Sequence, residues 1–273
     1  MSEVRTGTDA LLAGEIRIEG RIMPASNATF FGTVDLTDPD EPPSTDAVRC
    51  VYKPVAGERP LWDFPDHSLA GREVAAYAVS EALGWDIVPP TVLRDGPAGV
   101  GMVQTWREPD PEQSPVDLVA GDVVPEGYLH VLDAVDDRDR PVSLVHEDST
   151  ALRRMAVFDI VTNNADRKGG HVLAMTSGHR HGVDHGVCFH VENKLRTVLW
   201  GWLGQPLDPE DVARLEELAD QLTTAGSPLL EQLDRLISLN EVRATTGRVS
   251  GLLRRRRMPV PSGGWPAIPW PAF

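Results

Sequence analysis

The order of the periodic patterns along the chain constrains its fold most strongly. Segments near the N-terminus alternate polar and apolar residues, as in EIRIEGRI (15–22) and AVRCVYKPV (47–55), and a period of two is typical of strands. From about residue 148 the apolar residues recur at helical spacing, as in DSTALRRMAVFDIVTNN (148–164). A chain that changes its period in this way forms a sheet-rich part followed by a helix-rich part. We therefore predict an α+β fold with two lobes, a β-rich N-lobe and an α-rich C-lobe.

The middle of the chain indicates where the lobes meet. SLAGREVAAYAVSEALG (68–84) predicts a helix between a capping Ser and a closing Gly, and WDIVPPTVLRD (85–95) with GVGMVQTWRE (99–108) predicts a strand pair. Residues 109–139 are rich in Asp, Glu, Pro and Gly, which favours a loop-rich connection. The predicted boundaries follow, with the N-lobe at 1–107, the C-lobe at 108–258 and a Pro/Trp-rich tail at 259–273.

Proline positions predict where the later helices begin. Pro209 follows Asp208, and Pro228 follows Ser227, so that each proline takes the first helical position behind a capping residue. A further helix is predicted from about Glu241. In the tail, Trp265 and Trp270 are expected to pack back onto the protein, because exposed Trp is unfavourable. Near the N-terminus, TDPDEPPSTD (37–46) predicts an acidic, Pro-rich loop that follows a hairpin.

Charge and composition exclude several classes of function. The chain has 26 Lys and Arg against 41 Asp and Glu, a formal net charge of −15, which repels a phosphate backbone and argues against nucleic-acid binding. No apolar run approaches the roughly 18 to 20 residues that span a bilayer, and the first residues lack a signal-peptide pattern, so we expect a cytoplasmic protein. Any contact with a membrane surface or an acidic partner is expected to involve the four arginines Arg254 to Arg257. Cys50 and Cys188 are expected to be buried, reduced thiols.

Lysine is scarce in this chain, and its positions suggest phosphate chemistry. The only lysines are Lys53, Lys168 and Lys194, and Lys53 lies on a predicted strand. A helix carboxylate at Glu73 follows, then loop carboxylates at Asp166 and Asp184. A strand lysine can hold phosphate oxygens while a helix acid orients it. One loop carboxylate can accept the proton of an attacking hydroxyl, and the other can hold Mg²⁺. These are the parts that phosphoryl transfer requires.

The local sequences around these residues resemble a known superfamily. NADRKGGH (164–171) and GVDHGVCF (182–189) resemble the catalytic and metal loops of the phosphatidylinositol 3/4-kinase-like branch of the protein-kinase-like superfamily, to which HipA-type kinases are related. CVYKP (50–54) resembles its lysine strand, GREVAAYAVSEALG (71–84) the helix with the partner glutamate, and MVQTWRE (102–108) the hinge beside adenine. The chain also resembles an actinobacterial group related to these lipid kinases. The resemblance implies a two-lobed protein-kinase-like fold.

The resemblance implies a role for each matching residue. Catalysis would fall to Asp166 as base, with Lys53 and Arg167, although the sequence leaves open whether Arg167 and Lys168 contact the phosphoryl group or steady the loop. Glu81 is an alternative to Glu73 as the partner of Lys53. ATP with Mg²⁺ or Mn²⁺ would be the cofactors. The residues implied to bind nucleotide are Lys53, Glu73, Ser26, Asn27, Gln104 and Trp106, and those implied to bind metal are Asp184 and His171.

Two positions depart from the pattern and keep other functions open. His171 stands where the pattern has a metal-binding Asn, and PASNATFFG (24–32) lacks the Gly-rich loop. We expect an ATP-dependent phosphotransferase that acts on a hydroxyl of a protein or a small polyol of the inositol type. The alternatives are adenylyl transfer, a catalytically silent nucleotide-binding or regulatory protein, and a metal-dependent hydrolase. Five histidines could also form a zinc site, although no CxxC or HExxH motif accompanies them: His171, His179, His181, His185 and His190.

Overall fold

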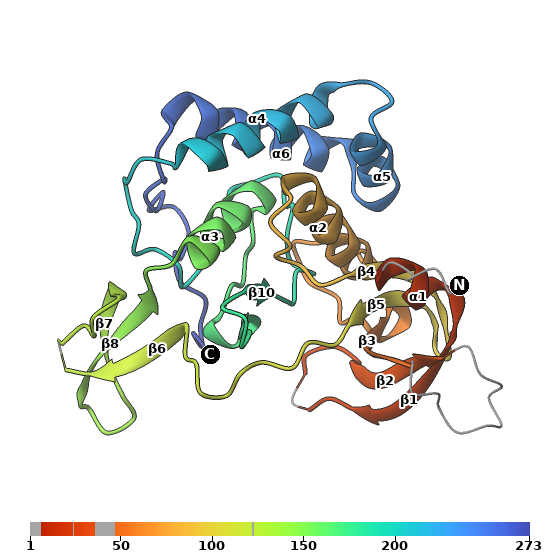
Figure 1. Ribbon diagram of the computed structural model, residues 1–273, viewed down its shortest axis with the longest axis horizontal. Helices are drawn as coiled ribbons and strands as arrows, with labels where there is room; N and C mark the ends of the chain where they lie inside the picture. Colours follow the sequence, from red (N-terminus) through yellow and green to blue (C-terminus); the bar gives the residue numbers. More distant parts are fainter. Residues whose placement is uncertain (1–6, 24, 36–46, 122) are drawn as a thin grey trace.

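The first part of the chain forms a five-stranded antiparallel sheet (Figure 1). The computed structural model describes residues 7–23, 25–35, 47–121 and 123–273, so the acidic loop predicted at 37–46 lies outside the described residues. The strand order is β1-β2-β3-β5-β4, with a short helix, α1, ahead of β1. The elements are α1 (Gly7–Ala13), β1 (Glu15–Arg21), β2 (Phe30–Asp35), β3 (Val48–Pro54), β4 (Thr91–Gly96) and β5 (Gly99–Thr105), and the 3-10 turn η1 (Val55–Gly57) follows β3.

Helix α2 (Leu69–Leu83) connects the sheet to the second half of the molecule. The prediction that Ser68 caps it through its side chain is wrong, because that hydroxyl donates to the carbonyl of Pro65. The carboxylate of Glu58 instead accepts hydrogen bonds from the backbone N–H groups of Leu69 and Ala70. A carboxylate at this end also favours the helix dipole. The helix closes at Gly84 with a φ of 65°, as the sequence predicts.

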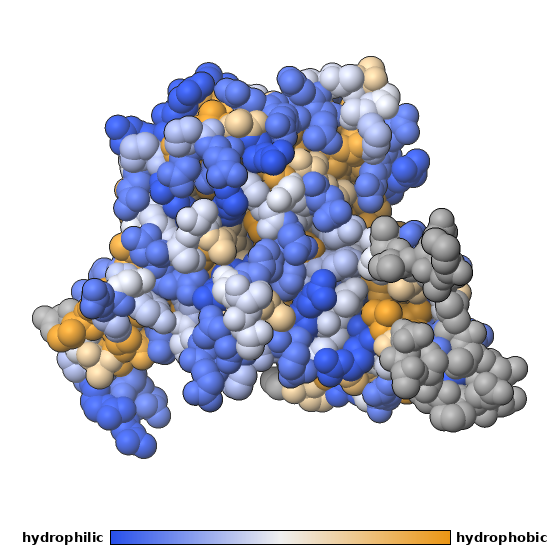
Figure 2. Space-filling model, in the orientation of Figure 1, coloured by the Kyte–Doolittle hydropathy of each residue, from blue (hydrophilic) through white to orange (hydrophobic). Residues whose placement is uncertain are grey.

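The segment after β5 corrects the predicted loop-rich connection. Residues 109–139 contain β6 (Val116–Ala120) and β7 (Tyr128–Val135), which pair on either side of β8 (Pro141–Glu147) in a separate three-stranded sheet. These strands are largely exposed, so the acidic side chains that suggested a loop lie on a solvated face. The sheet projects from the body of the molecule, and Figure 2 shows hydrophobic side chains on its surface. Leu118 and Val135 are among them.

From α3 onward the chain is mainly helical, as predicted. The remaining elements are α3 (Thr150–Thr162), η2 (Gly169–His171), β9 (Val172–Ala174), β10 (Arg180–Gly182), α4 (Pro209–Thr223), α5 (Pro228–Leu236) and α6 (Leu239–Arg255). The predicted starts at Pro209 and Pro228 are confirmed, although the side chain of Asp208 makes no capping bond. Helix α6 begins two residues before Glu241, which forms a capping box with Ser238. The α+β class is thereby confirmed.

One large core joins α2 to the helices of the second half. Leu83 of α2, Phe158 of α3 and Leu215 of α4 are fully buried in it. A smaller core lies between α1 and the five-stranded sheet. Cys50 and Cys188 are buried and free, as predicted. Within the described residues, no helix is both long enough and apolar enough to cross a bilayer.

The C-terminal tail runs back along the second half and ends beside η2 (Figure 1). The carbonyl of Ala267 accepts a hydrogen bond of 3.0 Å from the backbone N–H of Thr197, and the carbonyl of Ala272 accepts one of 2.8 Å from that of Gly169. Trp265 packs against the protein, as expected. The same expectation is wrong for Trp270, whose side chain is 85% exposed.

Candidate active site

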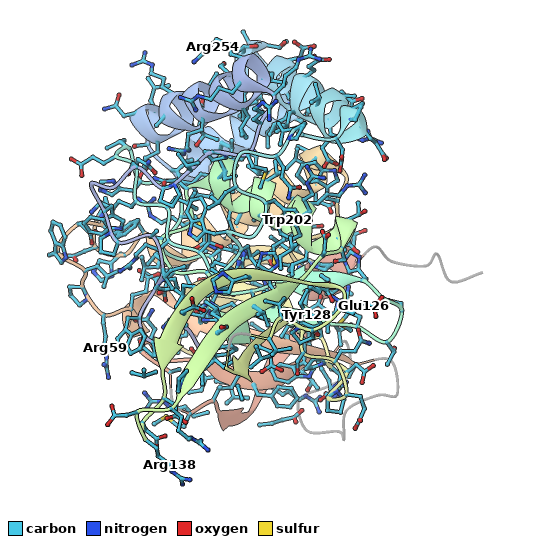
Figure 3. The ribbon with its side chains drawn as sticks, turned by 90° about the vertical axis from the view of Figure 1, so that its left-hand side faces the viewer. Arg59, Glu126, Tyr128, Arg138, Trp202 and Arg254 are labelled. Atoms are coloured by element: carbon cyan, nitrogen blue, oxygen red, sulfur yellow. The ribbon has the colours of Figure 1, made fainter. Side chains whose placement is uncertain are left out.

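A cavity of about 550 Å³ collects most of the residues that the sequence singles out. Its walls come from β3, α2, the loop after α3, the loop after β10, and the tail. Segments far apart in the chain therefore meet around one space. Arg59 also lines this cavity, and Figure 3 shows the residue on the left-hand side of the molecule. The predicted residues that line it are Ser26, Asn27, Lys53, Glu73, Asp166 and Asp184.

Lys53 lies between two carboxylates. Its Nζ is 2.7 Å from Oε1 of Glu73 and 2.8 Å from Oδ1 of Asp184. Burial opposes its charge, but Asp184 and Glu73 together raise the pKa of Lys53 above its ordinary value. The nearby ammonium holds the pKa of Asp184 well below its usual range. The lysine is therefore a fixed cation at the base of the cavity, and Asp184 is an anion with half of its side chain exposed.

Glu73 connects the lysine strand to the metal-loop segment. Its Oε1 accepts from Lys53, and its Oε2 accepts a hydrogen bond of 2.8 Å from the backbone N–H of His185. Burial raises the pKa of Glu73, and the Lys53 ammonium opposes that shift. The alternative partner, Glu81, lies on an exposed part of α2. The geometry thus pairs Lys53 with Glu73 rather than with Glu81.

Asp166 follows α3 on a loop that local hydrogen bonds hold in place. Helix α3 ends at Asn163, which takes a φ of 54°, a conformation that Asn tolerates. The side-chain oxygen of Asn164 accepts from the backbone N–H of Asp166 at 3.0 Å. The carboxylate of Asp166 lines the cavity, 3.3 Å from Nζ of Lys168. A carboxylate so placed can accept a proton from a hydroxyl that enters the cavity.

Arg167 points away from the cavity, and this corrects its expected direct part in catalysis. Its side chain is 0% exposed, and its guanidinium donates to the carboxylate of Asp159 and to the backbone carbonyls of His171 and Val183. It also donates to Nε2 of His185 at 2.7 Å. Of the two roles that the sequence leaves open for this arginine, only steadying the loop fits these contacts.

His171 and Asp184 form a plausible pair of metal ligands. Nδ1 of His171 donates to the carbonyl of Asp166 at 3.0 Å, which leaves Nε2 as the nitrogen with a free lone pair. That Nε2 lies 3.4 Å from Oδ2 of Asp184. Burial lowers the pKa of His171 and favours the neutral form that ligates metals. Neighbouring ligand atoms around an octahedral ion at about 2.1 Å are about 3 Å apart, so the two side chains fit a shared ion.

The residues implied to hold the nucleotide lie in two places. Ser26 and Asn27 line the cavity, and Oδ1 of Asn27 accepts from the backbone N–H of Arg59 at 2.8 Å. Gln104 is buried and donates from Nε2 to the hydroxyl of Thr91, so its amide is held within the sheet. The indole of Trp106 packs edge-on against Phe31 of β2 and donates to Glu108. Gln104 and Trp106 do not line the cavity.

A second set of residues supports the cavity from the protein interior and forms its rim. These residues were not singled out from the sequence as site residues. Asp159 is the buried anion that holds Arg167 and also accepts from Asn164. Lys194 forms an ion pair with Asp63 and lies over the rings of Trp62 and Trp265, at 4.5 and 4.8 Å. The sequence could have indicated the rim through Lys194, because lysine is rare in this chain. It could not have indicated Asp159, because that residue lies inside a helical pattern.

The predicted basic contact region lies elsewhere. The side chains of Arg254 to Arg257 are exposed at the end of α6. Figure 3 shows Arg254 at the opposite end of the molecule from Arg59. Arg256 contacts Glu216, and Arg257 donates to the carbonyl of Gly204. Two of the four arginines are therefore already engaged within the protein.

The chain has a strong similarity of sequence to one curated protein and a distant similarity of structure to solved proteins. The chain is 50% identical to protein Rv2133c of Mycobacterium tuberculosis over 282 aligned residues, which cover 99% of this chain and 97% of the relative. No family model matches the chain. Among solved structures, the crystal structure of CtkA, a proinflammatory kinase of Helicobacter pylori, is similar with a TM-score of 0.43 and 11% identity, covering 89% of this chain and 93% of that one.

Proposed function

The chain belongs to the family of the Mycobacterium tuberculosis protein Rv2133c, and we propose that it is an ATP-dependent phosphotransferase with a kinase-like active site. One observation carries the proposal. The ammonium of Lys53 is held between Glu73 and Asp184 on the wall of the cavity that Asp166 also lines. Phosphoryl transfer depends mainly on positioning and on electrostatic stabilisation, and this arrangement supplies a fixed cation, its orienting acid and a base.

Each residue has a part in the proposed reaction. Lys53 binds phosphate oxygens. Glu73 accepts one hydrogen bond from Lys53 and a second from the backbone N–H of His185, and so fixes the position of the lysine. The acceptor hydroxyl forms the new bond to the γ-phosphorus, the bond between that phosphorus and the bridging oxygen breaks, and ADP leaves. Asp166 takes the proton of the hydroxyl. Arg167 and Asp159 keep Asp166 in position without contacting the substrate.

Asp184 and His171 would hold a divalent ion, Mg²⁺ or Mn²⁺. The ion would neutralise charge on the phosphates. His171 keeps its Nε2 unprotonated by donating from Nδ1 to the carbonyl of Asp166. This contact also links the backbone of the base-bearing loop to the ion-binding pair. An imidazole ligand favours Mn²⁺ over Mg²⁺.

The far end of the cavity supports a small, polar acceptor. Arg59 and Arg196 supply positive charge there, Lys194 is paired with Asp63, and Trp62 and Trp265 supply ring faces. Aromatic faces with cations suit a polyol of the inositol type that carries anionic groups. A hydroxyl on a protein side chain is the second acceptor that we propose to test.

The first experiment separates nucleotide binding from transfer. Thermal unfolding is measured with ATP analogues and Mg²⁺ or Mn²⁺, and stabilisation by a nucleotide–metal pair is expected. No stabilisation by any pair would refute the nucleotide-binding site. A metal-dependent hydrolase would then become the leading alternative.

The second experiment tests the role of Asp166. With ATP labelled at the γ-phosphate, Asp166→Ala is expected to slow label transfer by about 10² to 10⁴-fold while leaving nucleotide binding intact. Equal rates in the two proteins would remove Asp166 from the role of base. In a parallel assay with ATP labelled at the α-phosphate, transfer of that label to the acceptor would indicate adenylyl transfer. Binding without any transfer would indicate a regulatory nucleotide-binding protein.

A further inference from the structure

Three side chains with metal-ligating atoms converge outside the cavity. Asp86 lies in the segment between α2 and β4, whereas His179 immediately precedes β10 and His181 is the middle residue of that strand. One ligand atom from each residue lies within 4.8 Å of the other two. The residues come from two parts of the chain almost a hundred positions apart. We call this group the Asp86 cluster.

The local backbone brings these residues together. Side chains alternate along an extended strand, so His179 and His181 share one face, and their rings lie 4.4 Å apart. A hydrogen bond of 2.8 Å from the backbone N–H of Gly182 to the carbonyl of Ile87 holds the hairpin beside the segment with Asp86. Asp86 itself has a φ of 49°, a left-handed conformation that Asp tolerates better than most residues.

The imidazole of His181 has a nitrogen that lacks a protein partner. The residue is only 5% exposed, and its Nδ1 forms no hydrogen bond within the described part of the chain. A buried polar atom without a partner is unfavourable, and such an atom often marks a missing ion or water. Burial and the neighbouring His179 lower the pKa of His181 to about 4, so the ring is neutral near neutral pH. Neutral imidazole is the form that binds metal.

His179 faces the oxygens of Asp86. Its Nε2 donates to the Asp86 carbonyl at 2.7 Å and lies 3.7 Å from Oδ2 of the carboxylate. The proton on Nε2 therefore points toward the oxygens of Asp86, and a bound cation would take the place of that proton. The Asp86 side chain is 61% exposed and that of His179 is 31% exposed, so an ion can reach the cluster from solvent.

We propose that Asp86, His179 and His181 bind a divalent transition-metal ion of the zinc class, with a water molecule in the remaining position. Two imidazoles and one carboxylate form a donor set that Zn²⁺ accepts at about 2.0 to 2.2 Å, and small rotations of the three side chains bring their ligand atoms to that distance. Mixed nitrogen and oxygen donors of this kind favour Zn²⁺ over Mg²⁺. The site is separate from the His171 and Asp184 pair.

An ion in the Asp86 cluster would connect two elements that carry active-site residues. The segment with Asp86 follows α2, which holds Glu73, and the hairpin with His181 leads within three residues to Asp184. At present one backbone hydrogen bond and the His179 contact join them. A metal bridge would restrain the hairpin relative to α2 and so reduce the freedom of the loop with Asp184.

Metal titration of the full-length chain tests the proposal. After treatment with a chelator and dialysis, Zn²⁺ or Co²⁺ is added alone, and the bound metal is measured by equilibrium dialysis and metal analysis. One equivalent is expected, and Co²⁺ is expected to give the visible absorption of a low-symmetry, four-coordinate site. His179→Gln and Asp86→Asn, which alter exposed side chains, should each weaken binding by about 100-fold or more.

Two further variants decide where the ion lies. His130→Gln is the matched control, since His130 forms an exposed pair with Asp133 at 2.7 Å without a second histidine, and it should retain binding. Unchanged binding in both His179→Gln and Asp86→Asn would overturn the proposal. Loss of the tight equivalent in His171→Gln but not in His179→Gln would assign the ion to the cavity and would also overturn it. Circular dichroism confirms that each variant is folded.

Discussion

The segments that carry Asp166 and Asp184 have a cavity face and a buried face, and the charged side chains on these two faces contrast sharply. Asp166 and Asp184 face the cavity and are partly exposed to solvent, whereas Arg167 and Asp159 between and behind them are completely buried. Charges that meet a substrate must be accessible, so their mutual attraction is screened by solvent. The charges that hold the loop are shielded from solvent, so removing one of them leaves its partner as an uncompensated buried charge. The adjacent residues Asp166 and Arg167 therefore differ: the first is accessible from the cavity, and the second stabilises the loop.

The largest expected effect lies on the buried face. Arg167→Met leaves the Asp159 carboxylate without its main partner, and breaking a buried pair from one side costs about 3–5 kcal/mol. Chemical denaturation is expected to show this loss in the free energy of unfolding. Arg214→Met, which removes an exposed pair with Glu217, should cost less than about 1 kcal/mol. Similar losses in the two variants would contradict the contrast between the faces.

A smaller effect is expected for Glu73, a buried residue whose carboxylate contacts Lys53 at the cavity. Glu73→Gln removes the charge that orients Lys53, and it should lower phosphoryl transfer by about 10- to 100-fold, equivalent to one charge-assisted hydrogen bond of about 1.5–3 kcal/mol. Steady-state kinetics with labelled ATP measures the change. Glu81→Gln, on the exposed surface of the same helix, is the control and should behave like wild type. A defect in Glu81→Gln as large as that in Glu73→Gln would refute the assigned pairing.

The rim of the cavity is expected to show a weaker effect. Trp265→Ala removes ring contacts to Lys194 at 4.8 Å and to Arg196 at 5.7 Å, for a loss of about 0.5–2 kcal/mol in the free energy of unfolding. Trp270→Ala changes an exposed ring in the same tail and should lie within about 0.5 kcal/mol of wild type. Equal losses would show that the tail packs differently from this arrangement.

The smallest effect concerns a buried histidine remote from the loop. Burial lowers the pKa of His146 below 6.5, and its Nε2 accepts from the backbone N–H of Gly201 at 2.9 Å. Because the unfolded chain takes up a proton first as pH falls, the stability that this residue contributes is present above pH 6.5 and declines below it. The decline cannot exceed about 1.4 kcal/mol per pH unit for one proton.

Denaturation of His146→Gln between pH 7.5 and 5.5 tests this dependence. The variant should lose stability less steeply than wild type as pH falls, because glutamine takes up no proton. His130→Gln, at an exposed histidine, is the control and should keep the wild-type slope. A steeper decline in His146→Gln than in wild type would contradict the stated sign.

Local sequence patterns predicted helix starts well where a single capping residue determines the first turn. Ser149 and Ser227 accept hydrogen bonds from the first turns of α3 and α5, because capping depends on a few neighbouring residues. Ser68 failed as a cap because Glu58, ten residues earlier, reaches the same N–H groups. The sheet between 116 and 147 escaped prediction because β6 and β7 are largely exposed, so that their polar residues resemble those of a loop.

For the candidate site, the sequence placed residue types in a meaningful order but could not orient them. Lys53, Glu73, Asp166 and Asp184 could be named from their order and local motifs, and the structure brings all four to one cavity. Neighbours such as Asp166 and Arg167 share the same local signal, yet they face opposite directions. The orientation of Arg167 depends on its partner Asp159, and the sequence did not indicate that Asp159 plays this part.

By itself, the sequence determined the α+β class, the helix starts at Pro209 and Pro228, and the set of charged residues available for chemistry. These follow from periodicity, capping and composition, which act over a few residues. Only the tertiary structure decided that Glu73 rather than Glu81 meets Lys53, that Arg167 is buried, and that Asp86 lies beside His179 and His181. Those outcomes depend on burial and on contacts between residues far apart in the chain, because a buried charge is stable only beside the partner that folding brings to it.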